Sequence, residues 1–523
     1  MTQYDAIVLG AGHNGLAAGV LLQEAGLRTA ILEAKRYAGG MASTVELFDG
    51  FRFEIAGSLQ FPTSSVVSKA LGLGSLPTVE LEVMSVSMRG IGDAPLVYYT
   101  DLMQLMTHLE ADHGSEVVMG MAELAGWAAA PTRAMGRFDV ETPPRTADEM
   151  LAMAADDAER RAIQEMLTAS ASEVIDRFIP DKEKHGALRG MLAFLACNSQ
   201  YRGPETAGSA YGFAFGFAVP DETATLMTKL EGGIGTLTRH LQERYATAGG
   251  ELVLGASATN ITTDGTHVTG VITDQGAFAA PVVVSTLEPG LTVGLAGAAA
   301  PEQVRTRFAA VDHRGSYVQM HFALDAVPEF VEPYELLNDP KMQGAIGLFS
   351  TPEELQQQYE DCRRGIVPAD PAVAFQIPSA QDPSLAPPGK AAASAYSLWF
   401  PVEGAAAEPH EYARLKAEMG QRVIDKIGRI APGFESLILK HTTFTPKHMS
   451  TMFGAPGGDW AQGLIHPEQM GAHRPGPQGW RDLPLGIDGL YLGGAGCHGG
   501  PGITFIPGYN AAKAVLAERA ATG

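Results

Sequence analysis

The sequence is poor in cysteine: Cys197, Cys362 and Cys497 are the only three in 523 residues. They are too few and too scattered for a disulfide framework or a zinc site, so we expect a reducing, cytoplasmic location and no bound metal. Lys and Arg form no blocks, and the formal net charge is −22 at pH 7. This charge argues against nucleic acid as a partner, because both would be negatively charged.

Long apolar runs are also missing. No uncharged apolar stretch approaches the roughly 20 residues that span a bilayer, and the N-terminus lacks the basic and apolar regions of a signal peptide. No G-x-S-x-G stretch marks a serine hydrolase. At 523 residues with 45% hydrophobic content, the chain is longer than one core needs. The sequence therefore predicts two domains and no transmembrane segment.

The N-terminal region has the pattern of a nucleotide-binding unit. Residues 4–10, YDAIVLG, predict a buried strand, and residues 14–26 have apolar side chains at helical spacing. Residues 28–34 predict a second strand, and Glu33 lies at its end. A carboxylate at this position can accept hydrogen bonds from ribose hydroxyls.

Between the first strand and the helix, Gly10, Gly12 and Gly15 spell G-x-G-x-x-G. The first glycine allows a tight turn, the second lets the backbone approach a pyrophosphate, and the third lets helix and strand pack closely. Gly39 and Gly40 follow soon after Glu33, where they let the chain pass close to the ribityl part of a flavin. This pair favours FAD over a nicotinamide dinucleotide.

A second G-x-G-x-x-G occurs near the C-terminus, at Gly494, Gly496 and Gly499. Only the 24 residues from 500 to 523 follow it, and they hold no second strand with an acid at its tip. We therefore expect this motif to serve the first motif's cofactor. The helix predicted after it would place its N-terminus toward the reduced flavin, an anion.

The middle of the chain is less informative. Residues 234–248 predict a helix, which short alternating strands follow, and residues 281–287 predict a buried strand. The apolar aromatic run 207–220 predicts a buried strand, with two alternatives: a wall for an apolar substrate, or a surface that dips into a membrane. Residues 365–390 are rich in proline and predict a loop packed on the core, with a lid as the alternative.

Six stretches carry a resemblance to a known family: GAGHNGL, LEAKRYAGGMAST, GGIGTL, DPSLAPPGK, TPKHMSTMFGAPGGD and GLYLGGAGCHGGPGI. In this order they resemble the phytoene desaturase-like FAD oxidoreductases of the amine-oxidase-like flavoprotein superfamily. Within that family the likeness is closest to the pyridine nucleotide-disulfide oxidoreductase domain-containing protein 2 group. The match runs from about residue 5 to 515.

The resemblance implies an α/β fold in which a Rossmann-type FAD-binding domain is built from three discontinuous segments. An α+β substrate domain is inserted between them. The implied FAD-binding segments are 1–70, 221–300 and 461–523, and the implied substrate-domain segments are 71–220 and 301–460.

The resemblance also implies a set of FAD-binding residues. The glycine motif with Asn14 would hold the pyrophosphate, Glu33 the ribose, Ala258 the adenine, and Gly502 with Ile503 the flavin ring. Ala495 stands where many relatives have an acid, so its contact to the ribityl chain would come from the backbone. The full set is Gly10, Gly12, Asn14, Gly15, Glu33, Ala34, Arg36, Gly40, Met41, Ala42, Gly57, Ser58, Ala258, Gly494, Ala495, Gly502 and Ile503.

Two residues beside the implied flavin are candidates for chemistry. His498 could transfer a proton or orient the substrate, and Cys497 could attach FAD covalently. Both can equally be mere neighbours of the ring.

Together these observations predict an FAD-dependent oxidoreductase that removes a hydride from a C–H bond of a small or apolar substrate. The electrons would pass to oxygen or a quinone, and peripheral membrane contact is compatible with the sequence. One alternative is a flavin amine oxidase. Another is an FAD-binding protein with a non-redox role, as an isomerase or a partner-binding protein. The sequence specifies no oligomeric state.

Overall fold

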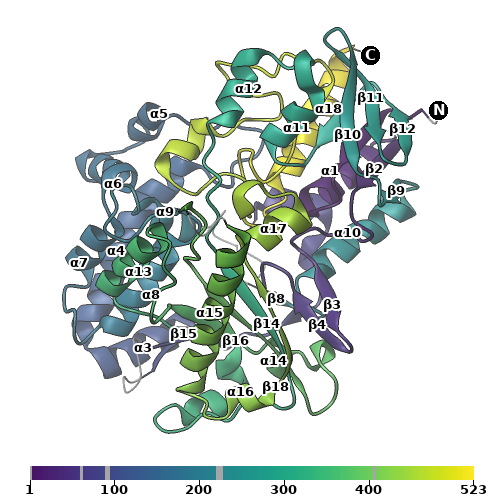
Figure 1. The fold of residues 1–523 in the computed structure, drawn as a ribbon. Coiled ribbons are helices and arrows are strands. Elements are labelled where there is room, and N and C mark those ends of the chain that lie inside the picture. Colours follow the sequence, from purple (N-terminus) through teal and green to yellow (C-terminus); the bar gives the residue numbers. More distant parts are fainter. Residues whose placement is uncertain (1–2, 59–62, 89–94, 219–227, 405–407, 523) are drawn as a thin grey trace.

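The computed structural model describes residues 3–58, 63–88, 95–218, 228–404 and 408–522. A five-stranded parallel sheet has the order β19-β13-β1-β2-β9. Its strands come from distant parts of the sequence: β1 (Ala6–Leu9), β2 (Thr29–Glu33), β9 (Glu251–Leu254), β13 (Val283–Ser285) and β19 (Leu490–Leu492). Both ends of the chain lie beside this sheet (Figure 1).

The two faces of this sheet are covered differently, as the alternation of side chains along β1 requires. Ala6 and Val8 pack in one core with the helices α1 (His13–Glu24), α2 (Ser65–Leu71), α10 (Gly235–Thr247) and α18 (Ile506–Thr522). Ile7 and Leu9 pack in another core on the opposite face. That face is covered by β10 (Ala258–Asp264), β11 (His267–Thr273), β12 (Gly276–Ala279), α11 (Pro289–Ala296) and α12 (Glu302–Ala309).

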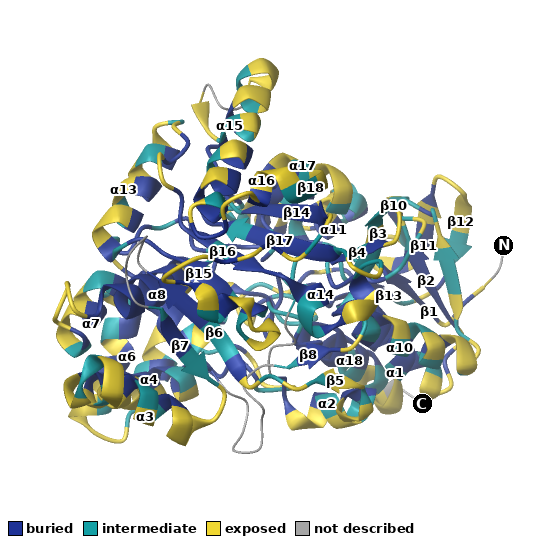
Figure 2. Cartoon of the chain, turned by 90° about the horizontal axis from the view of Figure 1, so that it is seen from below, coloured by how far each residue is buried: buried dark blue, intermediate teal, exposed yellow. Residues whose placement is uncertain are grey.

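A seven-stranded sheet has the order β18-β14-β17-β16-β15-β6-β7, in which only the pair β15 and β6 is parallel. Figure 2 shows this sheet as buried, with α15 (Pro409–Gly428) against it. Its strands are β6 (Val83–Met88), β7 (Leu96–Tyr99), β14 (Val318–Leu324), β15 (Ile346–Leu348), β16 (Val373–Gln376), β17 (Ala391–Ser397) and β18 (Ile438–Phe444).

The loop predicted over residues 365–390 is wrong in its middle, because β16 is a central strand of the seven-stranded sheet. Val373 and Phe375 are buried in the core of that sheet. The prolines lie outside the strand, where they remove no ladder hydrogen bond.

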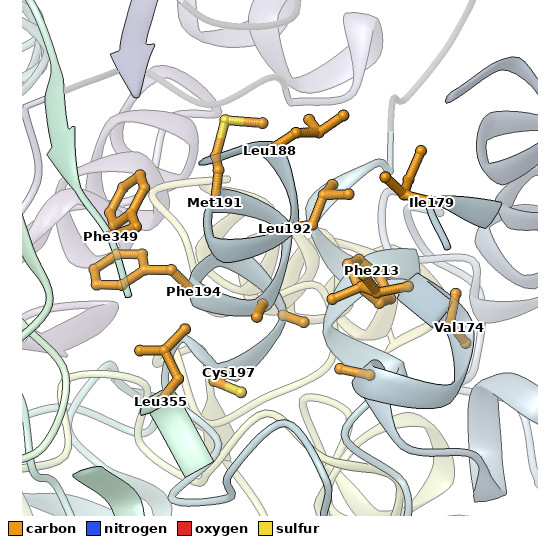
Figure 3. Close-up of a cluster of buried hydrophobic side chains, with 14 of the residues drawn as sticks. Val174, Ile179, Leu188, Met191, Leu192, Phe194, Cys197, Phe213, Phe349 and Leu355 are labelled. Carbon is orange, nitrogen blue, oxygen red and sulfur yellow. The ribbon is translucent and has the colours of Figure 1, made fainter. Parts of the chain in front are cut away.

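A helical layer covers the other side of this sheet. Its core is shown in Figure 3, where Phe194 from α8 lies against Phe349 and Cys197 lies near Leu355. The layer consists of α3 (Leu102–His113), α4 (Ser115–Met135), α5 (Ala147–Ala152), α6 (Asp157–Thr168), α7 (Ala171–Phe178), α8 (Gly186–Cys197), α9 (Tyr211–Gly216) and α13 (Pro352–Arg363).

The strand predicted over residues 207–220 is also wrong, because Tyr211–Gly216 form the helix α9. Tyr and Phe alternate with small residues here, which imitates the period of a strand. The small residues instead allow close helix packing: a Cβ on Gly212 would lie 2.0 Å from the carbonyl oxygen of Ala196 in α8. Residues 219 and 220 of this run lie outside the described part of the chain.

The other described elements are shorter and connect these layers. They include β3 (Thr44–Phe48), β4 (Phe51–Glu54), β5 (Thr78–Val79), β8 (Lys229–Leu230), α14 (Pro378–Gln381), α16 (Phe434–Leu437) and α17 (Pro446–Phe453). Across the described ranges, none of the helices combines the length and the apolar character needed to cross a bilayer.

The predicted α/β fold with a Rossmann-type sheet is confirmed. The strand, helix and strand predicted at the N-terminus correspond to β1, α1 and β2, and the predicted helix 234–248 corresponds to α10. The boundaries of the five segments stay predictions, and the one between 220 and 221 lies outside the described residues.

Candidate functional site

The N-terminal glycine motif forms the turn between β1 and α1. Gly10 has φ +91°, a conformation that favours glycine, and a Cβ on Gly15 would lie 1.9 Å from the carbonyl oxygen of Gly10. A Cβ on Gly12 would meet nothing within 4 Å. Gly12 is also the N-cap of α1 and supplies no side-chain acceptor. Open space therefore adjoins a helix N-terminus, which is the arrangement that binds a pyrophosphate.

Glu33 lies at the end of β2 with its carboxylate held by backbone amides. Its Oε2 accepts a hydrogen bond from the N–H of Ala11 over 2.7 Å, and its Oε1 accepts one from the N–H of Lys35 over 2.8 Å. Each carboxylate oxygen has a second lone pair left. The carboxylate is thus oriented and can still accept hydrogen bonds from two ribose hydroxyls.

Ala258 begins β10 close to this acid. The N–H of Ala256 donates to the carbonyl oxygen of Glu33 over 2.8 Å, which places the start of β10 beside the end of β2. The structure thus brings together the two residues implied at the adenosine end. Ala34 and Arg36 are exposed beside them.

The glycine pair lies directly on the first glycine motif. The N–H of Gly39 donates to the carbonyl oxygen of Ala11 over 2.7 Å, and Gly39 and Gly12 form a parallel bridge. A Cβ on Gly40 would lie 3.2 Å from the Cα of Gly12. Met41 is partly accessible, whereas Ala42 is buried. The chain after β2 therefore returns to the place where the pyrophosphate would bind.

The C-terminal motif reaches the same place from the other end of the chain. It follows β19, and the backbone N–H of Gly508 in α18 donates to Oδ1 of Asn14 in α1 over 3.3 Å. A Cβ on Gly508 would lie 2.1 Å from the carbonyl oxygen of Asn14, so the two helices touch through their backbones. The described residues after Gly499 form a short loop and then α18, which begins at Ile506, and not a second strand–helix–strand unit.

The segment after β4 closes the site from the side of the seven-stranded sheet. A Cβ on Gly57 would lie 3.4 Å from Cδ1 of Ile503. Ser58 Oγ donates to Oε1 of Gln376 over 2.9 Å, and Nε2 of Gln376 donates to the hydroxyl of Tyr396 over 2.6 Å. The C-terminal loop thus lies close to polar, neutral side chains of the second sheet.

Many of the implied FAD-binding residues share partial accessibility in a region that is otherwise buried. Gly10, Gly12, Glu33, Gly40, Met41, Gly57, Ser58, Ala258, Ala495, Gly502 and Ile503 all retain part of their surface, whereas Asn14, Gly15, Ala42 and Gly494 are buried. The accessible set extends from the adenosine end at Glu33 to Ile503. These residues fit an extended dinucleotide that lies along them.

His498 and Cys497 lie on a different side of the C-terminal loop. Both line a cavity of about 800 Å³ whose wall includes none of the implied FAD-binding residues. Burial lowers the pKa of His498 to about 4 and raises that of Cys497 to about 12, so the imidazole and the thiol are both uncharged at neutral pH. A neutral thiol is a poor nucleophile, and this disfavours covalent attachment of FAD at Cys497.

Two buried arginines also contact the C-terminal loop, and no sequence pattern indicated them. Nη2 of Arg137 donates to the carbonyl oxygen of Pro501 over 3.2 Å, and Nη1 of Arg474 donates to that of Ala495 over 2.5 Å. Arg137 follows the left-handed C-cap of α4, and Arg474 lies in an irregular segment. Only the tertiary fold brings these side chains to the loop.

Comparisons with known proteins agree with this geometry. A model of the family described as flavin containing amine oxidoreductase matches residues 15–330. The pyridine nucleotide-disulfide oxidoreductase domain-containing protein 2 of Mus musculus is 25% identical, with 99% of this chain and 94% of that protein covered. The phytoene dehydrogenase of Streptomyces griseus is 25% identical, with 98% and 96% covered.

Among solved structures, the cyclohexylamine oxidase from Brevibacterium oxydans aligns with a TM-score of 0.61 at 14% sequence identity. The alignment covers 99% of this chain and 100% of that chain. At this identity the likeness concerns the fold. It extends over both sheets and the helical layer.

Proposed function

Because the chain belongs to the flavin-containing amine oxidoreductase family and is an FAD-dependent oxidoreductase, we propose that it removes a hydride from a C–H bond of an apolar substrate. The product would carry a C=C or C=N bond, and the electrons would pass to oxygen or a quinone. The observation that carries this proposal is the meeting of both glycine motifs at one site, joined by Asn14 and Gly508.

FAD supplies the hydride acceptor, and the residues of the chain bind and orient it. In this proposal the N-terminus of α1 beside Gly12 binds the pyrophosphate, since open space adjoins a helix N-terminus that has no side-chain cap hydrogen bond. Glu33 binds the ribose, and the backbone near Ala258 contacts the adenine. The flavin end would lie near Gly57 and Ile503, where a Cβ on Gly57 would lie 3.4 Å from Cδ1 of Ile503.

The side chains near Gly57 support an apolar, uncharged substrate. Ser58, Gln376 and Tyr396 hydrogen-bond to one another, and burial raises the pKa of Tyr396, so the phenol stays protonated. The ring of Tyr317 lies 5.7 Å from that of Tyr396, and both residues are partly accessible. These groups can orient a substrate and exclude water without adding charge.

The buried cation Arg137 weighs against the amine oxidase alternative. It contacts the C-terminal loop at Pro501, and a protonated amine bound near this loop would meet a like charge. A neutral substrate avoids that repulsion. This argument supports dehydrogenation of a carbon skeleton over oxidation of an amine.

The experiment that tests the proposal is anaerobic reduction of the bound flavin by a panel of carotenoids, amines and cyclic ketones. We expect the flavin absorbance to bleach with a carotenoid or cyclic ketone and to stay unchanged with amines. Free FAD mixed with each compound is the control. Bleaching by amines alone would assign an amine oxidase, and no bleaching by any compound would support a non-redox role.

A further inference from the structure

Arg137 is a buried cation that lies against the loop between the C-terminal motif and α18. Its residue surface is 7% exposed. Nη1 donates to the carbonyl oxygen of Phe215 over 2.7 Å, Nη2 donates to that of Pro501 over 3.2 Å, and Nε has no hydrogen-bond partner. The guanidinium carbon also lies 3.6 Å from the centre of the Phe215 ring.

None of these partners is an anion. In the part of the chain that the structure describes, the contacts of Arg137 are carbonyl oxygens and aromatic rings. Arg474, the other arginine on this loop, differs because the carboxylate of Asp459 lies near enough to favour its charged form. Arg137 therefore stands out as the cation whose charge is not compensated.

Burial of such a charge is costly. Desolvation lowers the pKa of Arg137 to about 9, which still leaves the guanidinium charged at neutral pH. Carbonyl dipoles and an aromatic face recover part of the cost, but an unpaired buried charge is normally strongly destabilising. A buried cation without a counterion will stabilise a negative charge that develops beside it.

The position of Arg137 indicates where such a negative charge would develop. A Cβ on Gly502 would lie 2.6 Å from Nη2, so the guanidinium packs directly on the backbone of this glycine. Gly502 has φ +113°, which favours glycine, and it remains partly accessible. The charge is thus separated from the accessible side of the loop by little more than one peptide backbone.

We propose that Arg137 is a positioning residue that holds the loop at Pro501 and Gly502 and raises the reduction potential of the bound flavin. The inference rests on the proposed function, in which this loop lies beside the flavin ring. Transfer of a hydride, a proton with two electrons, to the neutral oxidised flavin leaves one negative charge on the ring. A fixed positive charge stabilises that product more than the oxidised flavin.

The test is a redox titration of the FAD-loaded protein with the variants Arg137→Met and Arg137→Lys. For Arg137→Met we expect FAD to stay bound and the equilibrium constant for two-electron reduction to fall at least tenfold, which is about 30 mV. Arg137→Lys keeps the charge and a donor for Pro501. For this variant we expect a reduction potential closer to that of wild type than to that of Arg137→Met.

Arg133→Met is the matched control. Arg133 lies on α4, four residues before Arg137, but it is half exposed and pairs with Glu159 over 2.6 Å. Its removal should leave the potential unchanged, because solvent screens an exposed charge. Should Arg137→Met fail to retain FAD, Arg137→Gln replaces it, since Gln keeps an amide donor and removes the charge.

An unchanged potential in an FAD-loaded Arg137→Met or Arg137→Gln variant would overturn the inference. An equal fall in the reduction potential in Arg137→Lys and Arg137→Met would overturn it as well. Arg137 would then act through the shape of its side chain and not through its charge. Loss of FAD from both uncharged variants would assign Arg137 to cofactor retention instead. None of these results affects the proposed function, which fails if no compound of the panel reduces the wild-type flavin or if amines alone reduce it.

Discussion

Asn14 in α1 accepts a hydrogen bond from the backbone N–H of Gly508 in α18, and this bond links the two ends of the chain. Asn14 lies inside the first glycine motif, and Gly508 lies in the first turn of the helix that follows the second. Because β1 and β19 belong to one parallel sheet, both motifs lie at the carboxyl ends of its strands. Ligands of such sheets bind at that edge.

The first prediction contrasts two glycines of the N-terminal motif. Gly12→Leu should abolish FAD binding and leave the fold intact, because a Cβ at Gly12 meets nothing within 4 Å and occupies only the ligand's space. Gly15→Ala should instead destabilise the protein, because its Cβ would lie 1.9 Å from the carbonyl oxygen of Gly10. Flavin absorbance and thermal unfolding of both variants measure the difference.

The reverse pattern would contradict this division. If Gly12→Leu retained FAD, the pyrophosphate would lie elsewhere. If Gly15→Ala unfolded at the wild-type temperature, the close approach of α1 to the turn at Gly10 would not be needed for stability.

The second prediction concerns Glu33. Glu33→Ala should weaken FAD binding by a few kcal/mol, since each hydrogen bond to a charged group is worth roughly 1.5 to 3 kcal/mol. It also removes the acceptor for the amides of Ala11 and Lys35, so the strand ends themselves lose support.

Glu33→Gln separates these two effects. Its amide oxygen can still accept one backbone hydrogen bond, but the charge that strengthens the ribose contacts is gone. Equilibrium dialysis against FAD should rank wild type above Glu33→Gln and Glu33→Gln above Glu33→Ala. Equal FAD affinity in all three proteins would show that Glu33 does not bind the ribose.

The third prediction concerns pH. The imidazole of His498 is buried and its pKa is lowered to about 4, whereas an unfolded chain protonates histidine near pH 6.5. Between these values the unfolded state binds more protons, so the free energy of unfolding falls as the pH is lowered through this window. Between about pH 7 and pH 5, the free energy of unfolding should therefore fall by about 2 kcal/mol less in His498→Gln than in wild type.

Denaturant unfolding at both pH values measures this, and His267→Gln is the control. The side chain of His267 is 70% exposed, so its replacement should leave the acid sensitivity unchanged. The same loss of stability in wild type and His498→Gln would mean that His498 is accessible to protons in the folded state.

The sequence indicates the local backbone geometry of the candidate site where short-range contacts determine it. The turn at Gly10, the acid at Glu33 and the return of the chain at Gly39 all depend on short-range geometry, and the structure brings them together. The two glycine motifs meet through the hydrogen bond between Asn14 and Gly508. The role of each residue toward FAD stays a prediction.

The predictions from the sequence were wrong or incomplete where tertiary contacts determine the local structure. The run around Tyr211 alternates like a strand but forms a helix, because Gly212 allows contact with the backbone of α8. The strand β16 was not predicted, because the prolines that flank it in the sequence indicate a loop. Arg137 and Arg474 reach the loop from distant segments, and burial of an arginine has no signature in a single sequence.

The central claim is that both ends of the chain hold one dinucleotide. The most direct measurement is the ratio of FAD to polypeptide in the purified protein, with FAD released by acid and quantified against the protein concentration. We expect one FAD per chain. A ratio near two would mean that the second glycine motif binds its own cofactor, and bound NADP in place of FAD would contradict the assignment of the site.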